Sequence, residues 1–155
     1  MNRIMFSREG EIRPAAVVLV GLVLSAMAFG INTLIANAVP PALGAPGEVS
    51  QFGTIKVALA TFPAVLGNTL GFHMSYRRYD PRALVKFLAP AAGFFVAFMG
   101  LPVWGLISGG TITAFAVAAT LNVVAVAVAV PALLAMRPGA APDDLRELRV
   151  EPAAK

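Results

Sequence analysis

The chain has 155 residues, of which 58% are hydrophobic and only 13% are charged, and its mean hydropathy is +0.79. Because soluble domains carry about 25% charged residues, this composition excludes an ordinary water-soluble protein. The absence of cysteine excludes disulfides and thiolate metal sites. A net charge of +4 would suggest nucleic acid as the partner of a soluble protein, but here the cations flank apolar stretches. Anionic lipid headgroups are the simpler partner, and we expect no nucleic acid.

The first predicted membrane span covers about residues 14–39. It is uncharged and long enough to cross a hydrocarbon core of about 30 Å with some tilt. Pro40 and Pro41 are expected to stop the helix, and the Pro-, Gly- and Ser-rich segment through Thr54 is expected to form a loop. A cleavable signal peptide is the alternative interpretation, but the apolar stretch is longer than the roughly 15 residues such a peptide uses.

Three further spans are predicted at about residues 57–76, 83–107 and 111–136. A basic turn separates the second span from the third, and a short Ser-Gly-Gly turn joins the third to the fourth. The sequence therefore predicts an all-α polytopic membrane protein. We expect one domain, residues 1–137, forming a four-transmembrane-helix bundle, and a mobile cytoplasmic tail at 138–155.

Lysine and arginine are distributed unevenly between the two sides of this bundle. Eleven of them fall in the N-terminal segment, the basic turn and the tail, whereas only Lys56 falls on the other side, and it is a weaker candidate site residue. Because short cytoplasmic segments carry the excess of these residues, both termini are predicted to be cytoplasmic. Arg77 and Arg78 in the basic turn are weaker candidates for binding an anionic lipid headgroup, since orientation alone explains their presence.

The spans contain no Asp or Glu, so their polar side chains are amides, hydroxyls and one imidazole. At 1.5 Å per residue, Asn68 and Asn122 lie near the midplane and Asn32 about 8 Å toward the outer side. These three form a candidate intramembrane polar cluster. It either lines a small-solute site or joins the helices through hydrogen bonds of about 0.6 kcal/mol each. His73 is a weaker candidate, because a lone histidine can carry a proton but lacks partners for a metal site.

Small residues recur at helical spacing in every span. We expect these faces to pack inside the bundle first and to contact a second copy second, because small residues let membrane helices approach closely. Gly67-x-x-x-Gly71 has the spacing of a dimerisation motif. The faces of the first and third spans consist of Gly21, Ser25, Ala28, Asn32 and Ala36, and of Ala89, Gly93, Ala97 and Gly100.

Several segments resemble a group of small actinobacterial four-span membrane proteins whose function is uncharacterised. The resemblance lies in a first span that ends in Asn-containing turns, a threonine-bearing second span, and the segments RRYDPRALVKF and TAFAVAATLNVVAVAVAVPALLAMR. It implies a bacterial plasma membrane location and no defined activity. A histidine often stands in that group at the place of Asn122, so the asparagine is a departure.

No nucleophile elbow, zinc-protease motif, phosphate loop or dinucleotide fingerprint occurs in the chain. We therefore expect a non-enzymatic structural or accessory subunit without a cofactor. The alternative is a small oligomeric transporter or channel with an Asn-lined path. The expected partners are the lipid bilayer and either a second copy or another membrane protein.

Overall fold

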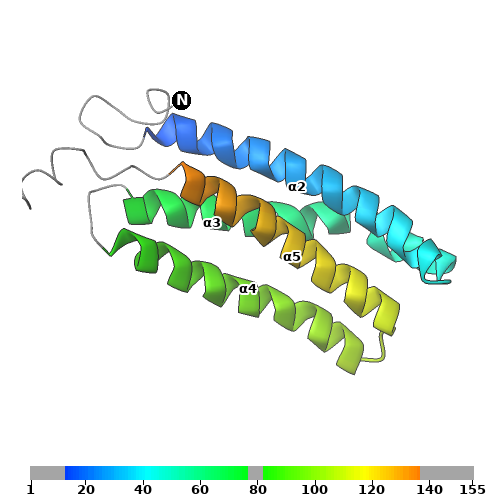
Figure 1. Ribbon diagram of the computed structural model, residues 1–155. Helices are drawn as coiled ribbons and strands as arrows, with labels where there is room; N and C mark the ends of the chain where they lie inside the picture. Colours follow the sequence, from blue (N-terminus) through cyan, green and yellow to red (C-terminus); the bar gives the residue numbers. More distant parts are fainter. Residues whose placement is uncertain (1–12, 77–81, 137–155) are drawn as a thin grey trace, which may run out of the picture.

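The computed structural model describes residues 13–76 and 82–136, and within them the fold is all-α (Figure 1). Four helices there are long and apolar enough to cross a membrane, as the hydropathy predicts. They are α2 (Pro14–Ala42), α3 (Thr54–Tyr76), α4 (Ala83–Ile107) and α5 (Ile112–Ala135), and a short 3₁₀ helix, η1 (Pro46–Phe52), lies between α2 and α3. The expected tail at 138–155 and the turn residues Arg77 and Arg78 lie outside the described residues.

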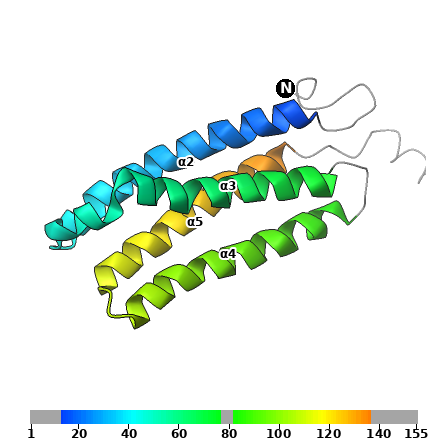
Figure 2. The ribbon, with the colours of Figure 1, turned by 180° about the vertical axis from the view of Figure 1, so that it is seen from behind.

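Three helices, α2, α3 and α5, pack against one another, and α4 packs on α3 and α5 on the side away from α2 (Figures 1 and 2). We call the end of the bundle that holds η1 and the turn 108–111 the loop end. The opposite end, where the described chain begins and finishes, is the terminal end (Figure 1). Helix α4 is the most peripheral of the four, because only 11% of its most apolar stretch is buried.

Two hydrophobic clusters fill the bundle, one in each half. The cluster toward the terminal end contains Phe72, whose ring meets that of Phe87 edge-on at a centroid distance of 5.6 Å. The cluster toward the loop end contains Ala36, Val57 and Leu121. Along each of α2, α3 and α5 the chain passes from one cluster to the other at the same level of the bundle. That level is where the buried polar residues of the next section lie.

The end of α2 differs from the prediction. The helix continues through Pro40 and Pro41 to Ala42, so the expectation that the proline pair stops it was wrong. Proline lacks a backbone donor but keeps its carbonyl, so it can still accept hydrogen bonds in a last turn. Ala45 donates to the Pro40 carbonyl at 2.8 Å and Gly44 to that of Pro41 at 3.0 Å. With Gly44 at a φ of 76°, this is a Schellman motif.

The same motif closes α4 at the loop end. Gly110 donates to the carbonyl of Gly105 at 2.9 Å, Gly109 donates to that of Leu106 at 3.2 Å, and Gly109 has a φ of 94°. A Cβ atom at Gly110 would stand 2.7 Å from the Gly105 oxygen, closer than real Cβ atoms come to a carbonyl. The predicted turn between the third and fourth spans is therefore confirmed. Gly109 is required for its positive φ, and Gly110 is required because a Cβ atom would clash with the Gly105 carbonyl.

The small-residue faces of α2 and α4 point in different directions. The face of α2 is buried along its whole length, from Gly21 to Ala36, as predicted. The expectation for α4 was wrong, because its small face is exposed and lies away from Phe87 and Ala91, which form the packing side. The spacing of small residues shows which of them share one face of a helix, but it does not show whether that face packs inside the bundle. The exposed face consists of Ala89, Gly93, Ala97 and Gly100.

Candidate functional site

Asn32 joins three helices at the level between the two hydrophobic clusters. Its side-chain nitrogen donates to Thr61 Oγ1 on α3 at 2.7 Å and to the Leu121 carbonyl on α5 at 3.1 Å. Thr61 in turn donates to the Val57 carbonyl at 2.8 Å. Asn32 and Thr61 are both fully buried. Because both donors of the amide are engaged between helices, this residue is suited to holding α2, α3 and α5 together.

Asn122 plays a comparable part between α5 and α4. Its side-chain nitrogen donates to the Phe98 carbonyl at 3.1 Å. Phe98 stands four residues before Pro102, which has no N–H to offer that carbonyl. Backbone groups inside a membrane need internal partners, and the amide of α5 supplies one here. Asn122 thus satisfies an acceptor that the proline leaves open.

The predicted polar cluster is not joined by direct hydrogen bonds. Asn68 is buried, but its side-chain nitrogen donates at 2.7 Å to the Ala64 carbonyl of its own helix. Within the described part of the chain, no hydrogen bond connects any two of Asn32, Asn68 and Asn122. Each of their side-chain oxygens is buried without a partner. A solute path lined by all three stays a prediction.

The weaker candidates lie at opposite ends of the bundle. His73 is half-buried one turn before the end of α3, and its Nδ1 atom has no hydrogen-bond partner. Lys56 is exposed in the first turn of α3 at the loop end. Arg77 and Arg78 belong to the undescribed turn. The histidine and the lysine therefore cannot form one site, since almost the whole length of α3 separates them.

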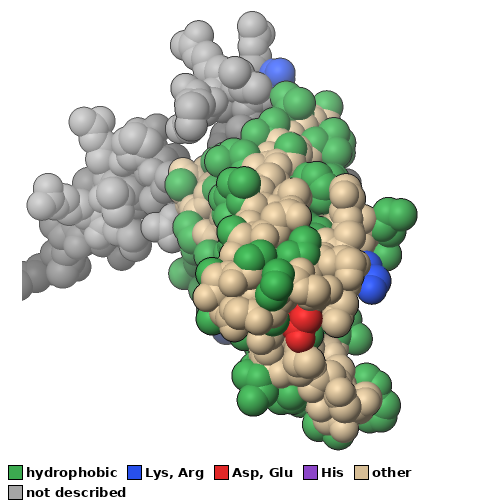
Figure 3. All heavy atoms as spheres, turned by 90° about the vertical axis from the view of Figure 1, so that its right-hand side faces the viewer, with side chains coloured by type: hydrophobic (Ala, Val, Ile, Leu, Met, Phe, Trp, Pro, Cys, Tyr) green, Lys and Arg blue, Asp and Glu red, His purple; other side chains and the backbone are tan. Residues whose placement is uncertain are grey.

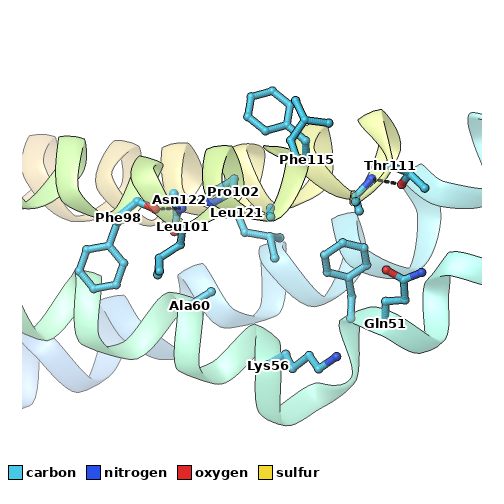
Figure 4. A pocket seen from close by; sticks show the side chains of 16 residues that line it. Gln51, Lys56, Ala60, Phe98, Leu101, Pro102, Thr111, Phe115, Leu121 and Asn122 are labelled. Atoms are coloured by element: carbon cyan, nitrogen blue, oxygen red, sulfur yellow. Dashed lines mark hydrogen bonds between the residues drawn. The ribbon is translucent and has the colours of Figure 1, made fainter. Parts of the chain in front are cut away.

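A pocket of about 380 Å³ lies between α3, α4 and α5 and reaches the loop end (Figure 4). Its walls are mostly apolar and include Phe98, Leu101, Pro102 and Leu121. Lys56 and Gln51 line it near η1, whereas Asn122 lines it near the middle of α5 (Figure 4). Of the three asparagines, only Asn122 belongs to this pocket.

Sequence reasoning singled out Lys56 and Asn122 but did not place them in one pocket. Small side chains leave the space that connects them, chiefly Ala60 on α3, Gly105 on α4 and Ala118 on α5. The available signal was the clustering of glycine and proline near the end of the third span. That signal predicts a break in packing, but it does not show which helices surround it.

Comparisons of the chain with protein-family models, with curated proteins and with solved structures found no match. The chemistry of the site must therefore be argued from its own residues. Among the described residues, no three His, Cys, Asp or Glu side chains come close enough to hold a metal ion. The pocket brings together a cation, amides and apolar walls. That set is suited to binding an amphiphile.

Proposed function

We propose that this multi-pass membrane protein is a non-enzymatic accessory subunit of a bacterial plasma membrane, and that it binds a partner helix through α4. Four apolar helices support the multi-pass arrangement. Nine arginines against three lysines fit a GC-rich bacterial source. The excess of cations at the N-terminus, basic turn and tail supports cytoplasmic termini.

The observation that carries this proposal is the direction of the small face of α4. Gly93, Ala97 and Gly100 point away from the bundle, and added Cβ atoms at the two glycines would meet nothing within 4 Å. Lipid tails give membrane helices no hydrophobic drive to associate, so close backbone approach over small residues is a principal source of affinity. A second copy of the chain and another membrane protein both satisfy this requirement.

The alternative, a small oligomeric transporter or channel, has less support. Asn32 uses both of its donors between helices, and Asn122 uses one on the Phe98 carbonyl. These contacts favour a fixed bundle over a path that opens along the amides. In proteoliposomes, a solute or ion flux above empty vesicles that Asn122→Leu abolishes would favour the alternative.

Site-specific photocrosslinking in native membranes tests the accessory role. The chain has no cysteine, so Gly93→Cys and Ala97→Cys each give a unique point for attaching a benzophenone maleimide. The matched control is Phe94→Cys, at a position that is 52% exposed and lies about 100° around the helix from Gly93. We expect one reproducible protein adduct, several-fold stronger at 93 and 97 than at 94. Adducts to lipid alone at all three positions would contradict the proposal.

A further inference from the structure

The pocket is elongated and runs inward from the loop end. On α5 its lining extends from Thr111 to Asn122, which corresponds to about 16 Å of helix at 1.5 Å per residue. Asn122 is 5% exposed and holds α4 to α5 through the Phe98 carbonyl, so the inner end is closed. An elongated and mostly apolar space of this length, closed at its inner end, fits a hydrocarbon chain better than a compact solute.

The polar lining of the pocket is concentrated at the loop end. Lys56 and Gln51 stand on one side of the opening, and Thr111 stands on the other (Figure 4). Thr111 is the N-cap of α5, where it accepts a hydrogen bond from Ala114 N–H at 3.0 Å. The N-terminus of this 24-residue helix therefore borders the opening with its partial positive charge. A lysine and a helix N-terminus together favour an anion.

Lys56 is unusual for its position in the chain. It is the only Lys or Arg between residues 14 and 76, and its ammonium has no hydrogen-bond or ion-pair partner among the described residues. Charged side chains are sparse on this end of the molecule (Figure 3). The excess of Lys and Arg on the opposite side of the bundle already predicts the orientation, so the orientation does not require a cation at the loop end. The position of Lys56 in the lining of the pocket explains why a cation stands at this end.

We infer that the pocket binds an anionic phospholipid, with one acyl chain between α3, α4 and α5 and the phosphate at Lys56 and the N-terminus of α5. Lys56 lies in the first turn of an apolar span, at the depth of headgroups, and its flexible stem lets the ammonium reach a phosphate. Inward from Lys56, the lining is apolar at Ala60 and Leu101. From the loop end inward, polar lining residues are thus followed by apolar ones, as the headgroup of a phospholipid is followed by its acyl chains.

A photoreactive phosphatidylglycerol with a diazirine in its acyl chain tests this inference on the full-length protein. The probe is added at low mole fraction to phosphatidylcholine vesicles, and adducts are mapped by peptide mass spectrometry. We expect adducts on the pocket segments of α4 and α5, displaced by unlabelled phosphatidylglycerol and not by phosphatidylcholine. Equal displacement by both lipids, or by oleate, would overturn the assignment of an anionic phospholipid.

Two pairs of variants separate the headgroup contact from the chain contact. Lys56→Gln should reduce pocket adducts about fivefold, the effect of one lysine at a lipid surface, whereas Lys86→Gln at the terminal end should not. Ala60→Phe fills the pocket and should abolish the adducts, whereas Leu59→Phe, at a site 65% exposed and outside the lining, should not. Unchanged adducts in both Lys56→Gln and Ala60→Phe, each with a wild-type elution profile, would overturn the inference.

Discussion

The side-chain nitrogen of Asn122 lies 3.1 Å from the carbonyl oxygen of Phe98, the acceptor that Pro102 leaves without a backbone donor. We predict that Asn122→Leu destabilises the protein by about 1–2 kcal/mol, because a partly buried carbonyl inside an apolar span then lacks its partner. In a Pro102→Ala background the same change should cost much less, since an alanine has a backbone N–H that can donate to that carbonyl. Unfolding by SDS in mixed micelles measures both. Equal costs in the two backgrounds would show that Asn122 does not compensate for the donor that Pro102 lacks.

Asn32 should contribute more to stability than any other amide in the bundle. Asn32→Leu removes two hydrogen bonds between helices, so we expect a loss of about 1–3 kcal/mol from bonds worth about 0.6–1.7 kcal/mol each in membrane proteins. Asn37→Leu is the control, because Asn37 is exposed and donates only to Thr33 of its own helix. A similar loss in both variants would argue against Asn32 as the link between α2, α3 and α5.

Asn68→Leu is predicted to be neutral or slightly stabilising. Its nitrogen donates only within α3 and its oxygen is buried without a partner, so the change removes an unsatisfied acceptor from the apolar interior. The measurement is the same SDS titration. If Asn68→Leu instead lowered stability as much as Asn32→Leu, a polar contact involving Asn68 in an oligomer would be the simplest explanation.

Gly21 marks a close approach of α2 to α3. A Cβ at this position would lie 3.0 Å from Thr69 Cγ2, so Gly21→Ala should destabilise the bundle by about 1–3 kcal/mol through overpacking. At Gly30, where an added Cβ meets nothing within 4 Å, the same substitution should stabilise the helix by about 0.5–1 kcal/mol. Thermal unfolding of the two variants checks the opposite signs.

The orientation can be tested because the chain has no cysteine. Ser50→Cys, exposed in η1 at the loop end, should react with a membrane-impermeant maleimide added to intact cells. Ala153→Cys in the C-terminal tail should react only after the membrane is permeabilised, since eleven cations predict that side to be cytoplasmic. The reverse pattern would mean that the protein has the opposite orientation.

The spans could be predicted because hydropathy depends on composition over about 20 residues and not on neighbours. The end of α2 was missed because a proline's effect on a helix depends on where in the last turn it falls. For Pro40 and Pro41 the deciding factor is Gly44, whose positive φ closes the Schellman motif behind them. A glycine three residues after a proline pair is a signal that sequence reasoning can use.

The candidate site was only partly predictable. Depth arithmetic places Asn68 and Asn122 at similar levels, but it does not give the rotation of α3 relative to α5. The partner of Asn122 turned out to be a carbonyl exposed by Pro102 on a third helix. The direction of the small face of α4 was likewise mispredicted, because in an alanine-rich helix small residues lie on several sides.

The two residues that accept hydrogen bonds from the Asn32 side chain are synthesised at different times. Thr61 follows it by 29 residues, but Leu121 follows it by 89 and belongs to the last helix. During synthesis the amide can therefore meet its first acceptor once α3 has entered the membrane, while the second is still to be translated. The contact of α2, α3 and α5 at Asn32 can therefore be completed only after the last span has left the ribosome. Helix α4 is inserted before that, at a stage when the core against which it packs still lacks α5.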